Sequence, residues 1–352
     1  MKHEIDLSKY KIRTDLAIEE ITEDYKRETK QYDEIKVEKI YIDEQISKKI
    51  NKKIGNYITI EFKDITDTEN KEKVKNIFKK EIKELLKEIK IKDKDLCLII
   101  GLGNRMSTPD SLGPKTIDNL IITNHLYELG FLGEEYRRVA AITPGVMGET
   151  GIETSDIIKS ISEKIKPDFV IVIDALASSS IERVNKTIQI TDTGIHPGSG
   201  IGNSRKEISK EILNVPVIAI GVPTTVDAVT IVSDTINYIT KHYSYTRKNI
   251  DNPMNKLIIK GNVNYLKKDI KIEKQEKQEL LGLIGNLNEE ETRQLIQETL
   301  TPIGYNFMVT PKEIDFIIQK LCDIIGNGLN ESLHKKIKWF FFFDIIFIHN
   351  HI

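Results

Sequence analysis

Residues Phe169-Val-Ile-Val-Ile-Asp-Ala-Leu-Ala-Ser178 give the clearest indication of the fold class of this chain. Its first five residues are apolar and mostly β-branched, which is typical of a strand buried on both faces. Such strands form parallel sheets that helices cover, and ligands bind to these sheets beyond the carboxyl ends of the strands. Asp174 follows the apolar run directly, so the pattern predicts a carboxylate at that margin of the sheet.

A second apolar run repeats this arrangement earlier in the chain. Residues 96–100, Leu-Cys-Leu-Ile-Ile, lead into a glycine-containing loop that carries Asp110. Because the carboxyl ends of neighbouring parallel strands meet at one margin of a sheet, we expect Asp110 and Asp174 to form a site there. The alternative is structural, with each acid capping the helix or turn that follows it.

Strand and helix patterns alternate along the chain. Strands are predicted at 57–63, 96–100, 137–142, 169–173, 187–191 and 215–221. Helices are predicted at 67–90, 113–129, 152–164, 227–240, 277–300 and 310–333. The stretch Thr310-Pro-Lys-Glu313 supplies an N-cap, a proline at N1 and a glutamate at N3 for the last helix. The alternation predicts an α/β fold, a wound and mostly parallel sheet flanked by helices, with a helical C-terminal region.

The length, net charge and cysteine content of the chain argue against several classes of protein. The chain has 352 residues and a formal net charge of -2, so it has no basic excess for binding nucleic acid. Its two cysteines, Cys97 and Cys322, cannot build a disulfide scaffold, which is typical of a reducing compartment. There is no secretory signal pattern, and no apolar stretch reaches the roughly 20 residues that span a bilayer. We therefore expect a cytoplasmic protein that binds neither nucleic acid nor membrane.

Other kinds of site fit the sequence poorly. Gly101-Leu-Gly103 follows a strand, but Met106 stands where a dinucleotide fingerprint needs its third glycine. The histidines form no His-Glu-x-x-His pair, and no Gly-x-Ser-x-Gly elbow is present. We therefore predict no cofactor and no metal. Asp192, which follows a predicted strand, and His196, in a glycine-rich loop, are candidates for a supporting role; the alternative for His196 is an ordinary hydrogen-bonded loop residue.

A pair of facing carboxylates can activate water against a carbonyl group. Two like charges at close range cannot both ionise, so the pair shares one proton and titrates as a unit. The ionised carboxylate activates water against the carbonyl carbon, and the protonated one supplies an acid. Asp110 and Asp174 are candidates for such a pair, the alternative of helix or turn caps stays open here, and the sequence does not assign which would be acid and which base.

Several long motifs in the same order resemble the germination protease of endospore-forming bacteria, over about residues 5–335. The matching stretches are Arg13-Thr-Asp-Leu-Ala17, Gly101–Asn104, Thr108–Pro114, Thr143–Gly148, Thr150–Thr154, Ile173–Ser178, Glu182–Asn185, Gln189–Gly200, Ala219–Pro223, Val226–Ala228 and Asn306–Glu313. The resemblance implies a fold similar to hydrogenase-maturation proteases, of the phosphorylase/hydrolase-like kind, and a homotetramer made as an inactive zymogen. It also implies an atypical aspartic-type peptidase with essential carboxylates at Asp110 and Asp174.

The resemblance further implies a substrate and a place of action. Substrates of the family are small acid-soluble, DNA-associated spore proteins, which an endopeptidase of the spore core degrades at germination. Their cleavage sites resemble an acidic residue followed by a bulky apolar one and a small one, and Asp15-Leu16-Ala17 fits this pattern. We therefore predict that the enzyme cuts its own Asp15–Leu16 bond. We expect the polar, weakly structured N-terminal segment to leave that bond accessible.

The predicted domain plan follows from these motifs. It comprises a propeptide at 1–15, a single peptidase domain at 16–335 with a surface excursion at 242–276 and a helical part at 277–335, and an apolar tail at 336–352. The Lys- and Asn-rich excursion and the tail depart from the family pattern. Two alternatives stay open: a metal-dependent maturation protease of the same fold that senses its metal through His196, and a non-catalytic binding protein that retains the fold.

Overall fold

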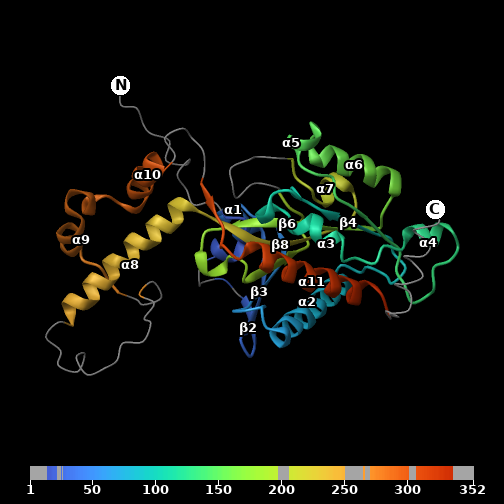
Figure 1. The fold of residues 1–352 in the computed structure, drawn as a ribbon, viewed down its shortest axis with the longest axis horizontal. Coiled ribbons are helices and arrows are strands. Elements are labelled where there is room, and N and C mark those ends of the chain that lie inside the picture. Colours follow the sequence, from blue (N-terminus) through green and yellow to red (C-terminus); the bar gives the residue numbers. More distant parts are fainter. Residues whose placement is uncertain are drawn as a thin grey trace. The chain divides into compact units, whose positions relative to one another are not determined.

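The computed structural model describes residues 14–21, 25, 27–196, 206–249, 265, 270–300 and 307–335, which form two compact units (Figure 1). Within these residues, the larger unit comprises 14–178, 182–225 and 310–335. The smaller unit comprises 179–181 and the described residues between 226 and 309. The predicted tail and most of the predicted propeptide lie outside the described residues, and the predicted domain plan stays a prediction.

The strand that decides the fold lies in the parallel half of the larger unit's sheet. β4 (Cys97–Gly101) lies between β5 (Val139–Ile142) and β6 (Phe169–Ser178) and runs parallel to both. The register places Gly101 beside Ile173. β6 is buried along nearly its whole length, as its apolar sequence predicts for a strand that is covered on both faces.

The other half of the sheet is antiparallel, and the strand order is β1-β2-β3-β7-β8-β6-β4-β5. The added strands are β1 (Arg27–Tyr32), β2 (Ile35–Ile42), β3 (Gly55–Glu61), β7 (Thr187–Thr191) and β8 (Val217–Asp227). The predicted α/β class is confirmed, and the sheet is mixed. The β1–β2 hairpin was not predicted, because the buried Glu38 looks like a surface residue in the sequence. It is neutralised by Arg27 and Lys36, at 3.3 and 2.8 Å.

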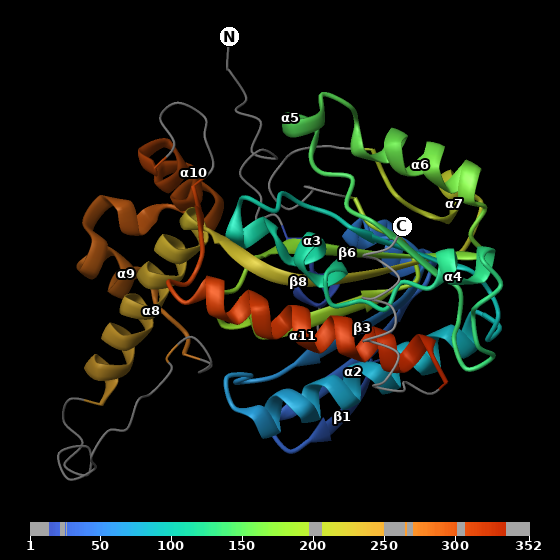
Figure 2. The same cartoon turned by 45° about the vertical axis from the view of Figure 1, so that its right-hand side comes forward.

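Helices cover both faces of this sheet (Figure 2). On one face lie α2 (Thr68–Glu88), α3 (Leu112–Ile117) and α11 (Ile314–Leu333), which share a core with the odd-numbered side chains of β6. On the other face, α6 (Thr154–Ile165) and α7 (Lys210–Leu213) share a core with Val170 and Val172. Gly328 lets α11 approach α2 closely, because a Cβ atom there would lie 2.5 Å from the ring of Phe78.

Several short helices connect the strands of the larger unit, and the smaller unit is mostly helical. The short elements are η2 (Ala17–Glu19), α1 (Glu44–Ile50), η3 (Thr108–Asp110), α4 (Asn124–Glu128), α5 (Met147–Thr150) and η4 (Ile181–Arg183). The smaller unit contains α8 (Ala228–Lys248), α9 (Lys274–Leu281), η8 (Gly282–Asn286), α10 (Glu289–Leu300) and β9 (Met308–Val309). The described ends of the predicted excursion at 242–276 are therefore helical, and most of its middle lies outside the described residues.

The helix predicted at 113–129 is wrong, because the chain forms α3 and α4 with an irregular segment between them. Distant groups hold that segment out of the helical conformation. Asn330 Oδ1 accepts a hydrogen bond from Ile121 N at 2.9 Å, and Thr123 Oγ1 donates to Arg137 O at 2.6 Å. These partners lie on other elements, so the local periodicity did not reveal them.

The predicted start of the last helix is also wrong. α11 begins at Ile314, with Glu313 rather than Thr310 in the N-cap position. The hydroxyl of Thr310 instead donates to Thr224 O at 2.9 Å, so it ties the chain to β8. A tertiary hydrogen bond has thus replaced the local cap that the sequence pattern favours.

Two further expectations concern the cysteines and the membrane. Cys97 and Cys322 are free thiols buried in the core, and burial raises the pKa of both. Buried thiols with a raised pKa are inert, and neither cysteine is paired in a disulfide. Across the described ranges, the helices are all too short or too polar to cross a membrane.

His334 gives the fold a pH dependence. Its side chain is 3% exposed, and its Nδ1 atom accepts a hydrogen bond from Arg137 N at 3.2 Å, which requires the neutral imidazole. Burial lowers the pKa of His334 to about 4, and the charge of Arg137 acts in the same direction. Between pH 6.5 and 4 the unfolded chain therefore binds a proton that the folded chain does not, so stability falls as the pH falls.

We expect the free energy of unfolding to drop by about 2–3 kcal/mol between pH 7 and pH 4.5 from this group alone. His334→Asn keeps an acceptor for Arg137 N but cannot titrate, so its unfolding should lose this part of the pH dependence. Urea unfolding of both proteins at the two pH values measures the difference. Identical pH dependence in the two proteins would show that His334 does not carry it.

Candidate active site

Asp174 lies within β6 rather than after it. The strand was expected to end at residue 173, but it continues to Ser178, so a turn starting at Ala175 is ruled out. Asp174 nevertheless lies at the carboxyl end of the neighbouring strand β4, because β4 stops at Gly101 beside Ile173. Asp174 is therefore the first β6 residue beyond β4. Asp174 is 6% exposed, and its Oδ1 atom accepts a hydrogen bond from Ala175 N at 2.9 Å.

Asp110 reaches the same margin through the loop that follows β4. It ends η3, and its Oδ2 atom accepts a hydrogen bond from Asn104 N at 2.7 Å. Leu102 N donates to Ile173 O at 2.8 Å, which ties the loop to β6 next to Asp174. Gly103 has φ +111°, and a Cβ atom there would lie 2.0 Å from Asp110 O, so only glycine allows this closure. The structure thus positions both predicted carboxylates with one loop and one strand.

Asp192 lies at the opposite margin. It follows β7, which runs antiparallel to β8, so it lies where β8 begins. Val170 N donates to Pro216 O at 2.9 Å, so β6 begins at that margin too. The two carboxylate oxygens of Asp192 accept hydrogen bonds from N and Nδ2 of Asn56, both at 2.8 Å. The structure therefore places Asp192 at the junction of β3 and β7, away from Asp174.

His196 is half exposed, and its Nε2 atom lies 3.3 Å from the Glu207 carboxylate. Glu207 also pairs with Lys53, which contacts Glu211 at 2.8 Å. The hydrogen bond from Lys53, with a further one from Ser209, lowers the pKa of Glu211 to about 2. Across the described parts of the chain, no group of three or more His, Cys, Asp or Glu side chains is arranged to hold a metal ion.

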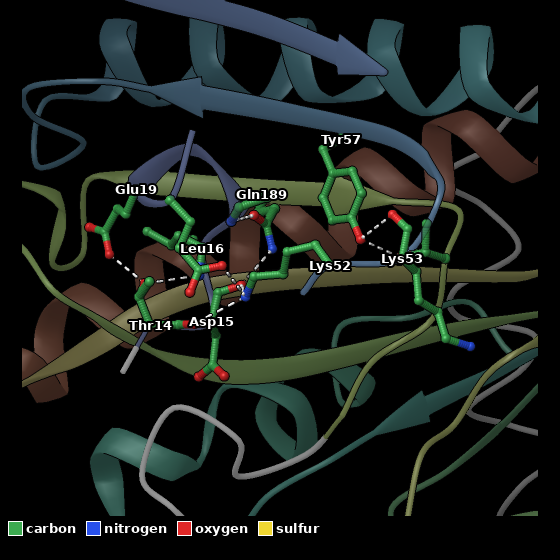
Figure 3. Close-up of polar contacts among 11 residues, drawn as sticks. Thr14, Asp15, Leu16, Glu19, Lys52, Lys53, Tyr57 and Gln189 are labelled. Carbon is green, nitrogen blue, oxygen red and sulfur yellow. Dashed lines mark hydrogen bonds and ion pairs between the residues drawn. The ribbon is translucent and has the colours of Figure 1, made fainter. Parts of the chain in front are cut away.

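The segment around Asp15 is bound into the larger unit, as Figure 3 shows. Asp15 N donates to Ala177 O at 3.1 Å, and Ala177 N donates to Asp15 Oδ2 at 2.9 Å. Ala17 N donates to Gln189 Oε1 on β7 at 2.8 Å. Leu16 is fully buried, in a cluster that includes Leu176. The expectation of an accessible Asp15–Leu16 bond is therefore wrong.

The carbonyl of the predicted cleavage bond has two side-chain donors. Asp15 O accepts a hydrogen bond from Gln189 Nε2 at 3.3 Å and lies 3.4 Å from Lys52 Nζ, a second donor. Lys52 reaches this position because α1 ends at Asn51 in the left-handed conformation, with φ 54°. Its ammonium also contacts Thr14 O at 3.1 Å. Gln189 and Lys52 therefore both help to anchor the carbonyl of Asp15 in the bound segment.

The segment covers the face of β6 that carries Asp174. Side chains on a strand alternate between faces, so Leu176, which packs on Leu16, shares its face with Asp174. Ala177, which holds Asp15, is three residues beyond Asp174, or about 10 Å along an extended strand. The bond is thus held near the carboxylate margin but displaced from it along the strand.

A cavity of about 100 Å³ adjoins this segment. Its lining includes Asp15, Lys52, Gln189 and His196. Tyr57 also lines it, and burial raises the pKa of its phenol, which donates to Lys53 O at 3.2 Å. The cavity is polar on the side of the Asp15 carbonyl, where Lys52 and Gln189 lie.

Sequence reasoning missed Lys52 and Gln189 as contacts of the Asp15 segment, and it also missed Glu19, whose carboxylate accepts a hydrogen bond from Thr14 Oγ1. Gln189 gave a signal, because it is a polar residue at the centre of the buried strand Thr-Ile-Gln-Ile-Thr. A buried amide needs partners, and here they are the backbone groups of Asp15 and Ala17. Lys52 and Glu19 gave none, because charged residues are common throughout this chain.

Comparisons with known proteins give the family. The germination protease of Geobacillus sp. (strain WCH70) is 50% identical over 362 residues, which cover 96% of this chain and 97% of that protein. The germination protease of Bacillus cytotoxicus is 49% identical over 357 residues, with the same coverage. A [NiFe] hydrogenase maturation protease, HycI from Thermococcus kodakarensis KOD1, is 19% identical with a TM-score of 0.26, over 41% of this chain and 80% of that one. A family model described as germination protease matches residues 3–339, and the chain therefore belongs to the germination protease family.

Proposed function

We propose that this member of the germination protease family is an endopeptidase of the spore core that begins the degradation of small acid-soluble spore proteins. The observation that carries the proposal is the 50% identity to a germination protease over 96% of the chain. The shared margin of Asp110 and Asp174 supports the mechanism. One carboxylate activates water against the peptide carbonyl, and its protonated partner supplies a proton to the leaving nitrogen.

The proposal extends to partners and place of action. The substrates are DNA-associated, but the net charge of -2 gives the enzyme no general attraction to DNA. The enzyme therefore meets its substrates as proteins, in the cytoplasm of the forespore and spore. A homotetramer is the assembly expected from the family resemblance.

A protease stored beside its substrate must be held inactive, and we propose that residues 1–15 serve this purpose. The buried Leu16 and the hydrogen bonds of Asp15 and Ala17 keep the segment on the Asp174 face of β6. Self-cleavage at Asp15–Leu16 then requires the segment to shift along the strand or to leave its site. That requirement makes processing slow until conditions loosen the segment.

The proposed function is tested with a purified small acid-soluble spore protein as substrate and mass spectrometry of the products. We expect cleavage after an acidic residue and, in the same spectrum, a new Leu16 terminus on the enzyme. Full activity in a chain that still begins at Met1 would contradict the zymogen. Loss of activity with a chelator would favour the metal-dependent alternative, and a processed but inert chain would favour a binding protein.

Weakening the anchor of the segment should accelerate processing. Gln189→Ala removes the acceptor of Ala17 N and a donor to Asp15 O, at a cost of about 1–3 kcal/mol to the bound segment. The population of released segment, and with it the rate at which the Leu16 terminus appears, should rise roughly 5- to 150-fold. Gln319→Ala on the exposed surface of α11 is the matched control. Slower processing in Gln189→Ala would indicate instead that Gln189 assists the cleavage itself.

A further inference from the structure

Thr14 separates the nitrogen of Leu16 from a buried carboxylate. Leu16 N donates to Thr14 Oγ1 at 3.0 Å, and Thr14 Oγ1 in turn donates to Glu19 Oε2 (Figure 3). One hydroxyl oxygen therefore lies between the predicted cleavage nitrogen and the carboxylate. Thr14 belongs to the part of the chain that processing would remove, whereas Glu19 and Leu16 would stay.

Glu19 is held in place independently of Thr14. Its side chain is 5% exposed, and its Oε1 atom accepts a hydrogen bond from Ser178 Oγ at 2.5 Å. The guanidinium of Arg183 lies 3.5 Å from the same oxygen. Removal of Thr14 would take one hydrogen-bond donor from the other oxygen, Oε2, and would vacate the position of the Thr14 hydroxyl beside it.

We infer that Glu19 is the docking site for the α-ammonium group that processing creates on Leu16. This inference rests on the proposed cleavage of the Asp15–Leu16 bond. Water adds its hydroxyl to the Asp15 carbonyl carbon, the C–N bond breaks, and the nitrogen takes a proton. At neutral pH the products are an Asp15 carboxylate, which leaves with residues 1–15, and a Leu16 ammonium.

The docking needs only a small movement. An amide offers one N–H donor and an ammonium offers three, each able to form a charge-assisted bond to Glu19. The buried Leu16 side chain, in its cluster with Leu176 and Tyr57, keeps the new terminus close to its former place. Closing the space left by one hydroxyl requires a shift of about one hydrogen-bond length, roughly 3 Å.

The ion pair also links processing to β6. Ser178, the last residue of β6, donates to Glu19, and Asp174 lies four residues earlier on the same strand. The pair can form only after cleavage, because the amide nitrogen of the intact chain carries no charge. Glu19 is thus a positioning residue that distinguishes the processed chain from the intact one.

The test measures the reactivity of the new α-amine with an amine-acetylating reagent, read by mass spectrometry of the N-terminal peptide. In the processed wild-type protein, we expect the Leu16 amine to be acetylated at least 10-fold more slowly than after denaturation. Glu19→Gln should remove most of this protection and raise the native rate at least 10-fold. Glu20→Gln is the matched control, because its carboxylate faces Lys52 at 3.6 Å, and it should behave as wild type.

Two outcomes overturn the inference: equal acetylation rates in wild type and Glu19→Gln, or equal rates in native and denatured wild type. If no Leu16 terminus ever appears in the full-length chain, the proposed self-processing fails instead. The docking site is then tested in a chain that folds with a removable fusion in place of residues 1–15, so that its removal frees Leu16. The same two comparisons decide the inference there.

Discussion

Asp174→Asn is expected to reduce the cleavage of a small acid-soluble spore protein by about 10²- to 10⁴-fold, the usual contribution of a positioned acid or base. The amide keeps the size of the side chain and an oxygen that can accept the hydrogen bond of Ala175 N. It cannot hold a negative charge or accept a proton from water. The fold should therefore persist while the activation of water is lost.

The rate should be measured on chains that share the same N-terminus, because an inactive variant cannot process itself. A removable fusion that leaves Leu16 as the first residue gives wild type and variant an equal start. Asp156→Asn is the matched control. Asp156 lies on α6 and forms an exposed ion pair with Lys206, so the same chemical change there should leave activity at the wild-type level. Activity of Asp174→Asn within 10-fold of wild type would show that Asp174 is not part of the catalytic pair.

Asp110→Asn tests the other half of the pair. Its Oδ2 atom accepts the hydrogen bond of Asn104 N, which an amide oxygen can still accept after the change. If the two carboxylates share one proton, each single variant and the double variant should lose similar activity, because they act as a unit. Additive losses would instead mean that the two acids work in separate steps.

Phe78→Ala is expected to lower the free energy of unfolding by about 3–5 kcal/mol, the usual cost of removing a buried phenylalanine ring. Phe78 is fully buried on α2 and faces Gly328 on α11, where no Cβ atom can fill the space that the ring leaves. The two helices cannot collapse onto the cavity without moving away from the β-sheet. We therefore expect the cavity to lower the free energy of unfolding by the full amount, with no relief from collapse of the helices.

Urea unfolding followed by circular dichroism measures this change. The dependence of the unfolding free energy on urea concentration should have the same slope in both proteins, which shows that only stability has changed. Phe316→Ala on α11 is the matched control, because Phe316 is 53% exposed and its ring lies 5.1 Å from the ammonium of Lys320. Its cost should stay below about 1 kcal/mol. A loss of similar size in both variants would contradict the proposed role of the α2–α11 contact.

The parallel half of the sheet could be predicted from the sequence alone, and the same pattern led to the prediction of a carboxylate site at its margin. Continuous apolar runs at 96–100 and 169–173 are readable because a strand buried on both faces must be apolar at every position. Because parallel strands end at one margin, Asp110 and Asp174 were predicted to lie there, and their pairing stays a prediction. The helix over residues 67–90 was equally readable, because one face repeats with the helical period.

Only the tertiary structure decided features that depend on partners far away in the chain. The direction of β7, and hence the distance of Asp192 from Asp174, follows from its antiparallel pairing with β8, which no local pattern encodes. The bound state of residues 14–17 depends on Ala177 and Gln189, more than 160 residues away. Residues 14–17, Thr-Asp-Leu-Ala, show no strand or helix periodicity in the sequence, and they become buried only because the folded sheet offers a matching face and hydrogen-bond partners.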